Sequence, residues 1–213
     1  MPRRMRRVSE RRRGWLAVSV FAAWTLLVAL RWLAPLDLHV TTLVQRYGQH
    51  WLDVALFGFT LLGSVESTGL LVAATGVWLW ARGRRRAAWV LWASLSALTL
   101  IELTLKFTVP QPHVPNTFNR SPASGILWLH LRTPYAFPSG HTLRSVFILG
   151  YIAALIGQGQ PRRRVLRALL WTVIALICVS RIYLGDHWAS DVIGGVLLAA
   201  AGLAWIQRKA SIV

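Results

Sequence analysis

The sequence predicts an all-α membrane protein, a bundle of six transmembrane helices with a short interfacial helical segment between the first two spans. Hydrophobic residues make up 55% of the 213 and charged residues only 15%, with a mean hydropathy of +0.48. The apolar residues fall in long runs, and the basic residues gather in the segments between those runs. Too few polar side chains remain to cover a water-soluble globule, so the apolar surface must face lipid.

The six candidate spans follow one another with short polar connections. The first covers residues 15–33, and we expect it to be retained as a helix because no small-residue cleavage site follows it. The others cover roughly residues 65–81, 87–106, 141–157, 166–182 and 188–206. Some of these runs are shorter than the ~20 residues that a bilayer requires, and polar residues complete them at their outer ends.

Residues 35–64, between the first two spans, mix polar and apolar side chains. This mixture predicts an interfacial helix and turn rather than a span. The polar residues concerned are Asp37, His39, Gln45, Arg46, His50 and Asp53.

Arginine-rich segments predict the orientation. They lie near the N-terminus, at residues 82–86, at 162–167 and at 208–209, which are alternate connections of a six-span chain. Because basic residues concentrate on the cytoplasmic side, both termini are expected in the cytoplasm of a plasma membrane, with the other connections outside. The predicted organisation is a basic cytoplasmic tail at 1–14, a six-span domain at 15–206 and a second tail at 207–213.

The charge balance, 24 Lys and Arg against 7 Asp and Glu, gives a formal charge of +17. A nucleic-acid-binding protein would gather these charges on one surface, whereas here they alternate with spans. Anionic lipid headgroups are therefore the expected partner, and no nucleic acid. The single cysteine, Cys178, cannot form an intrachain disulfide and is expected to serve packing.

Polar residues recur at the outer ends of four predicted spans. Ionisable side chains at a membrane edge are costly unless they are used, so their convergence on one face indicates a functional site. The set contains two cations, two imidazoles and one carboxylate: Lys106, Arg181, His141, His187 and Asp191.

His187 and Asp191 are four residues apart at the start of the last span. On a helix they share a face, so the carboxylate can reach an imidazole nitrogen. A carboxylate that fixes the tautomer of a histidine makes it a competent nucleophile.

The tetrapeptide Pro138-Ser139-Gly140-His141 lies where a loop enters the fourth span. The exposed amides of Ser139 and Gly140 at a helix N-terminus can bind an anion, and His141 can protonate a leaving oxygen. Lys106 ends the third span with Glu102 one turn earlier, so these two charges can neutralise each other. Together the parts form a trap for a phosphoryl group.

Lys106, Pro138-Ser139-Gly140-His141 and Ser180-Arg181-x5-His187-x3-Asp191 resemble the three signature motifs of the type 2 phosphatidic acid phosphatase superfamily. The resemblance covers roughly residues 52–206, with the motifs between 106 and 191. It implies a six-span enzyme with its motifs on the outer side. The outer loop at 116–135, with Trp128, His130 and Arg132, is expected to lie over the active site, and a merely interfacial loop is the alternative.

The resemblance also implies the chemistry. His187 would attack phosphorus to form a phosphohistidine, oriented by Asp191, and His141 would protonate the leaving group. Lys106, Ser139, Gly140 and Arg181 would bind the phosphoryl oxygens. No metal or other cofactor is expected, since the acidic residues are few and scattered.

The first motif departs from the family pattern. The family has Lys-x6-Arg-Pro, whereas this chain has Lys106-x6-His113-Val114. A permanent bidentate phosphate ligand is therefore missing. Either Arg144, one turn after His141, or His113 itself is a candidate to supply the replacement.

The expected function is thus hydrolysis of a lipid phosphate at the outer membrane face. Polyprenyl diphosphate, phosphatidylglycerol phosphate and phosphatidic acid all fit, and the composition, typical of a bacterial plasma membrane, favours the polyprenyl carrier. A lipid phosphotransferase using the same intermediate remains an alternative, as does a non-catalytic lipid-phosphate binder or transporter.

Overall fold

The computed structural model describes residues 3–122, 132–156 and 159–209. Apart from one short 3-10 turn at Asn116–Phe118, the regular elements in these ranges are α-helices. They are α1 (Arg3–Ala29), α2 (Ala34–Gln45), α3 (His50–Leu62), α4 (Val65–Ala81), α5 (Arg85–Thr108), α6 (Gly140–Ile156), α7 (Pro161–Tyr183) and α8 (Ala189–Lys209). The all-α fold predicted from the sequence is confirmed.

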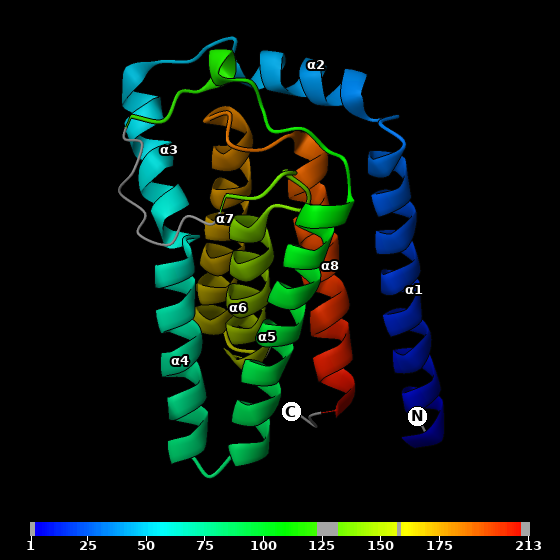
Figure 1. Cartoon of the computed structure of the whole chain (residues 1–213). Coiled ribbons are helices and arrows are strands. Elements are labelled where there is room, and N and C mark those ends of the chain that lie inside the picture. The colour runs from blue at the N-terminus through cyan, green and yellow to red at the C-terminus, as the bar shows by residue number, and fades with distance from the viewer. Residues whose placement is uncertain (1–2, 123–131, 157–158, 210–213) are drawn as a thin grey trace.

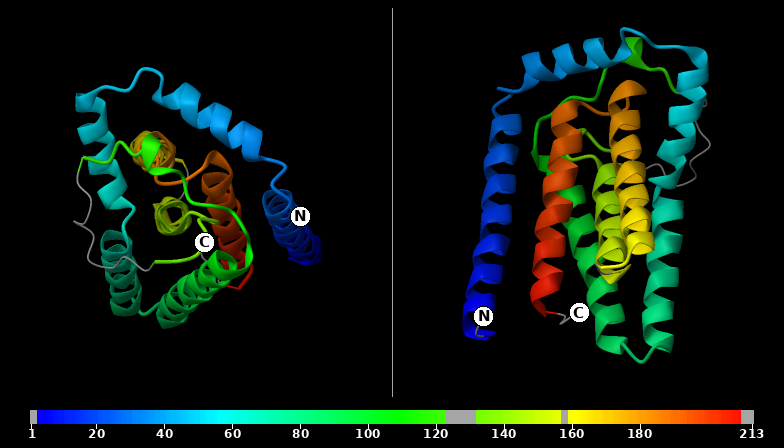
Figure 2. Two further views of the ribbon diagram at one scale, coloured as in Figure 1. Left: turned by 45° about the horizontal axis from the view of Figure 1, so that its top comes forward. Right: turned by 180° about the vertical axis from the view of Figure 1, so that it is seen from behind.

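The long helices run side by side, and α2 lies across one end of them (Figure 1). Seen from that end, α6 is central, with α4, α5, α7 and α8 around it and α1 outermost against α8 (Figure 2). The turn at Arg82–Arg84 joins α4 to α5, and Gly83 adopts a φ of +74°, which favours glycine. Both chain ends lie at the end opposite α2 (Figure 1).

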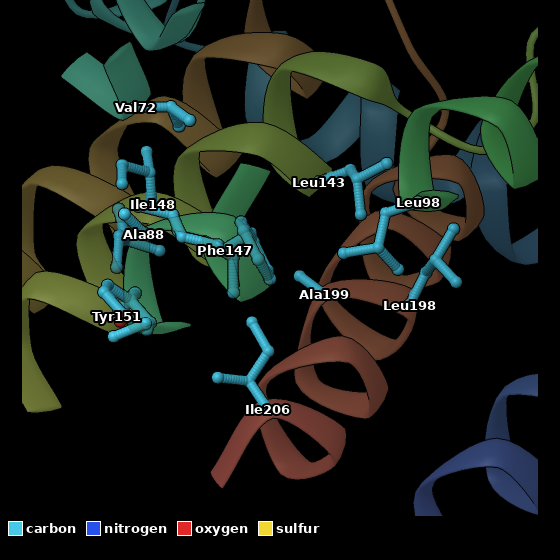
Figure 3. Close-up of a cluster of buried hydrophobic side chains, with 14 of the residues drawn as sticks. Val72, Ala88, Leu98, Leu143, Phe147, Ile148, Tyr151, Leu198, Ala199 and Ile206 are labelled. Atoms are coloured by element: carbon cyan, nitrogen blue, oxygen red, sulfur yellow. The ribbon is translucent and has the colours of Figure 1, made fainter. Parts of the chain in front are cut away.

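The main core lies on the inner faces of α4, α5, α6 and α8. Leu143, Phe147 and Ile148 of α6 are fully buried. In Figure 3 Leu143 lies toward Leu98 of α5, whereas Ile148 lies on the side of Val72 of α4 and Ala88 of α5. By contrast, many large apolar side chains on the outside of the bundle are exposed, such as Leu70, Trp89 and Leu169. This inside-out distribution is expected of a protein whose surroundings are lipid.

The predicted count of six spans is not confirmed by helix length and composition. Within the residues that the structure describes, three helices, α5, α7 and α8, are long and apolar enough to cross a membrane. The pairs α1–α2 and α3–α4 satisfy the same test only as bent pairs, which raises the number to as many as five. Helix α6 is apolar, but its 17 residues are too few for the same test.

The segment predicted to be interfacial divides into two different helices. Helix α2 turns by 91° from α1, as a helix lying along the surface would. Helix α3 is bent by 41° from α4 and continues it (Figure 1), and the two helices pass the length and composition test for a span together. The polar residues His50 and Asp53 that suggested an interfacial position lie in its first turn.

Candidate active site

The polar residues singled out from the sequence meet at the end of the bundle beneath α2. Lys106 comes from the last turn of α5, His141 from the first turn of α6, Arg181 from the last turn of α7, and Asp191 from the first turn of α8. Each of these side chains is at most 9% exposed. The ends of four helices therefore place these side chains in one buried cluster.

The His187–Asp191 pair forms as the spacing predicted. His187 Nδ1 lies 3.3 Å from Asp191 Oδ2, and the same oxygen accepts from the amide of Trp188 at 3.1 Å. With Nδ1 facing the carboxylate, Nε2 is the nitrogen available for attack. Asp191 Oδ1 is buried without a hydrogen-bond partner among the described residues, so this oxygen retains an unused acceptor.

The imidazole of His187 is held neutral. Its pKa lies well below the ordinary value of a histidine, first because burial disfavours the charged ring and second because Lys106 and Arg181 are positive neighbours. These effects outweigh the attraction of the nearby carboxylate. A neutral ring is the form that can act as a nucleophile.

The two predicted cations have different surroundings. Lys106 Nζ donates to the carbonyl of Ala136 at 3.2 Å. Arg181 is held between two groups, donating from one terminal nitrogen to Thr60 Oγ1 at 2.7 Å and to Asp186 Oδ2 at 2.9 Å. Its Nε is buried without a hydrogen-bond partner among the described residues, so the guanidinium retains a donor for a ligand.

The turn at Ser139–Gly140 is hydrogen-bonded directly to Asp191. The amide of Ser139 donates to the carbonyl of Asp191 at 3.0 Å, and Ser139 Oγ accepts from Thr142 at 3.2 Å. A side chain at Gly140 would overlap the carboxylate of Glu102, which explains a glycine here. His141 follows immediately in α6 and is 9% exposed.

Glu102 lies within electrostatic range of Lys106, as expected, but its salt bridge is with another residue. Glu102 Oε2 accepts from Arg144 at 2.9 Å across the α5–α6 interface, and both side chains are buried. Arg144 is therefore near the site but already neutralised by a carboxylate. His113, the other candidate replacement for the missing arginine, is exposed, and its Nε2 lies 2.9 Å from the carbonyl of Thr133.

The loop that follows α5 crosses the turn between α7 and α8. Trp188 Nε1 donates to Pro112, and the amide of Arg120 donates to Leu184. Trp128 and His130, expected to cover the site, lie outside the described residues, and Arg132 is exposed.

Sequence reasoning missed several residues that contact the cluster. Thr60 and Asp186 both bind Arg181, and Asp37 binds the residue before Asp191. Asp186 lies inside the third motif, so its proximity to Arg181 could have been expected. Thr60 comes from α3 and Asp37 from α2, and no local spacing relates them to the motifs. In the ranges that the structure describes, no group of three or more His, Cys, Asp or Glu side chains is arranged to hold a metal ion.

Comparison with known proteins assigns the family. The model of the PAP2 superfamily matches residues 87–211, more than half of the chain. The chain belongs to the PAP2 superfamily. This confirms the resemblance, although the family model begins later than the residue 52 expected from the sequence.

Individual PAP2 proteins are similar to this chain at a sequence identity below 30%. Phosphatidylglycerophosphatase B of Escherichia coli K12 is 28% identical over 174 residues, covering 63% of this chain and 67% of the relative. The protein of that name from Bacillus subtilis is 29% identical over 68 residues, 30% of this chain and 34% of the relative.

Two solved structures share the fold. One is the first transmembrane PAP2 type phosphatidylglycerolphosphate phosphatase from Bacillus subtilis, with a TM-score of 0.76 and 18% identity over 92% of this chain and 94% of that one. The other is Aquifex aeolicus LpxE, with a TM-score of 0.51 and 25% identity over 79% of this chain and 93% of that one.

Proposed function

We propose that this protein is an integral membrane lipid phosphatase that works through a phosphohistidine on His187. The observation that carries the proposal is the buried His187–Asp191 pair, with a neutral imidazole and two cations nearby. A protein that only bound lipid phosphates would need the cations but not an oriented nucleophile.

The reaction proceeds in two steps. Nε2 of His187 attacks phosphorus, the bond to the leaving oxygen breaks, and His141 gives that oxygen a proton. Water then attacks the phosphohistidine, losing its proton to His141, and inorganic phosphate leaves as the nitrogen–phosphorus bond breaks. Asp191 holds the ring through Nδ1 and stabilises the positive charge that it acquires.

The phosphoryl oxygens are bound by Lys106, Arg181, the amide of Gly140 and the hydroxyl of Ser139, since the amide of Ser139 already donates to the carbonyl of Asp191. Lys106 lies within electrostatic range of both Asp191 and Arg181, so one anion can face all of these groups. Arg144 supports this cluster through Glu102, a weaker replacement for the missing arginine than a direct phosphate ligand. No cofactor takes part in this scheme.

The substrate is a lipid whose headgroup ends in a phosphate or diphosphate. The names of the relatives above favour phosphatidylglycerol phosphate as the first to test, followed by polyprenyl diphosphate and phosphatidic acid. The bilayer delivers such a lipid from the side, and the cluster lies at one end of the bundle, where a headgroup would sit.

The proposed topology has six spans, counting each bent pair as one and including α6. Both termini and the arginine-rich turns face the cytoplasm, and the cluster faces the outside. The spans occupy residues 15–206, with tails at 1–14 and 207–213.

The test is phosphate release from a panel of lipid phosphates by detergent-purified protein in EDTA, with His187→Ala alongside. Turnover in chelator that vanishes in the variant, together with acid-labile phosphate on the wild-type protein, supports the proposal. Turnover only with added metal would contradict it. Turnover only with an added lipid alcohol would instead indicate the phosphotransferase.

A further inference from the structure

A second buried carboxylate, outside the motifs, binds the first turn of α8. Asp37 of α2 is only 2% exposed. Its Oδ1 accepts from the amide of Ser190 at 2.8 Å, and its Oδ2 accepts from the hydroxyl of Ser190 at 2.6 Å. Gln111 Nε2 donates to the same Oδ2 and to Ser190 Oγ, each at 3.1 Å.

The position of Asp37 explains how its charge is tolerated. It lies in the first turn of α2 and accepts a hydrogen bond from the amide of Ser190 in the first turn of α8, whose N-terminus favours a negative charge. Both carboxylate oxygens are hydrogen-bonded, as a buried charge requires. Replacing the carboxylate by an amide would leave the donors of Ser190 and Gln111 with one acceptor oxygen between them.

Three groups of Ser190, its amide, hydroxyl and carbonyl, are hydrogen-bonded to other helices. Asp37 binds its amide and hydroxyl, and Trp24 of α1 donates from Nε1 to its carbonyl at 3.0 Å. The next residue, Asp191, accepts from the amide of Ser139 through its own carbonyl. The peptide units on either side of the Asp191 Cα are thus bound by α1 and by the Ser139–Gly140 turn, and Asp37 of α2 binds the peptide unit before them.

We propose that Asp37 is a positioning residue for catalysis, fixing Asp191, and through it the His187 ring, by binding the first turn of α8. This inference rests on the proposed function. Asp37 contributes nothing to the binding of the lipid phosphate, because its oxygens are occupied by Ser190 and Gln111. Its loss tilts the first turn of α8 and so displaces the acid that orients the nucleophile.

The two helices that supply this support lie outside the region matched by the family model, which begins at residue 87. Trp24 and Asp37 precede it by more than a helix length. The N-terminal helices therefore serve the active site in addition to anchoring the chain.

The test compares Asp37→Asn, Ser190→Ala and the double variant with wild type, measuring kcat and KM on the best lipid phosphate together with thermal unfolding. For Asp37→Asn we expect kcat to fall by up to about 10²-fold with KM nearly unchanged, because a small misplacement of a catalytic group acts on the transition state. Ser190→Ala should reduce kcat less, since the hydrogen bond from its backbone amide to Asp37 remains. The double variant should be no worse than Asp37→Asn, because both changes break one contact.

Thr41 provides a matched control. It lies one turn further along α2, is fully buried, and its hydroxyl has no hydrogen-bond partner among the described residues, so Thr41→Val should keep wild-type kcat.

Wild-type kcat in folded Asp37→Asn, or losses that multiply in the double variant, would overturn the inference. If Asp37→Asn does not fold, Ser190→Ala decides alone, and full kcat there overturns it. His187→Ala, measured in parallel, distinguishes failure of the Asp37 inference from failure of the proposed function. Activity in that variant refutes the proposed function itself.

Discussion

Arg181 illustrates how neighbouring residues set the strength of a phosphate site. Its guanidinium is buried and is shared between the hydroxyl of Thr60 and the carboxylate of Asp186. The Asp186 side chain is 27% exposed, so water can replace it when a stronger anion arrives. Asp186 and a substrate phosphate therefore compete for the same cation.

We predict that Asp186→Asn strengthens product inhibition by inorganic phosphate. The inhibition constant should fall by up to about fivefold, since a partly exposed ion pair contributes at most about 1 kcal/mol. Asp53→Asn is the control, because Asp53 binds Arg120 instead. Unchanged or weaker inhibition would mean that Asp186 orients Arg181 for phosphate rather than competing with it.

The depressed pKa of His187 predicts the acid side of the activity profile. A free histidine titrates near pH 6.5, but burial and the cations Lys106 and Arg181 keep this ring neutral at lower pH. The acid limb of kcat/KM, corrected for the second ionisation of the substrate near about pH 6, should therefore lie below pH 6.5.

The lowered pKa of His187 should also make folding stability fall as the pH is lowered. Below about pH 6.5 the unfolded chain takes up the proton that the buried ring resists, so the contribution of His187 is present above that pH and declines below it. Thermal unfolding of wild type and His187→Gln across this range measures the effect. An acid limb above pH 6.5 would contradict both expectations.

Spacing along one helix predicted one contact in full and another only in part. His187 and Asp191 are four residues apart and do meet. Glu102 and Lys106 have the same spacing and interact electrostatically, but the salt bridge of Glu102 is with Arg144 of the neighbouring helix. The sequence alone shows which residues share a helix face, but not which side chain of a packed neighbour competes for the same partner.

Among the elements, α8 approaches the Ser139–Gly140 turn more closely than any side chain would allow. A Cβ on Gly195 would lie 2.6 Å from the carbonyl of Ser139 and 3.0 Å from Cβ of Thr142. The obstacle is backbone, so it cannot rotate away. The motif turn and α8 are thus in direct contact.

Gly195→Ala should push the Ser139–Gly140 turn away from α8 and reduce kcat by about 10²-fold. Gly69→Ala is the matched control, since a Cβ there meets nothing within 4 Å. It should retain activity and gain roughly 0.5–1 kcal/mol of stability, as alanine does in a helix interior. Steady-state kinetics and thermal unfolding of both variants provide the check, and full activity in Gly195→Ala would contradict it.

The helices themselves were largely predictable, because apolar runs mark them directly. The predicted stretch at 65–81 coincides with α4, whereas that at 166–182 forms only part of α7. Helix α7 begins five residues earlier, since arginine favours helix even where it leaves the membrane. The sequence predicted an interfacial position for α3 from His50 and Asp53, which lie in its first turn, with Asp53 bound to Arg120.

At the scale of the whole molecule, the arginine-rich turns and both chain ends lie opposite α2 and the cluster (Figure 1). Such segregation favours one orientation, with the basic end in the cytoplasm. The sequence predicted this separation from charge alone, but it could not show that α1 and α2 reach the site, because that contact spans 153 positions from Asp37 to Ser190.

Cysteine labelling tests the orientation. In a Cys178→Ser background, Asn116→Cys should react with a membrane-impermeant maleimide added to intact cells, and Gln160→Cys should react only after the membrane is opened. Both positions are exposed, and neither is an arginine of the topology signal. The reverse pattern would place the cluster in the cytoplasm.

The packing of α1 against α8 has a consequence for synthesis. Trp24 and Asp37 are synthesised before Ser190 and Asp191, so α1 and α2 precede the helix that they contact. Until α8 is in place, Asp37 lacks the hydrogen-bond donors of Ser190. A nascent chain that stalls before α8 already carries the phosphate-binding residues and His187 but lacks Asp191, so its nucleophile has no carboxylate to orient it.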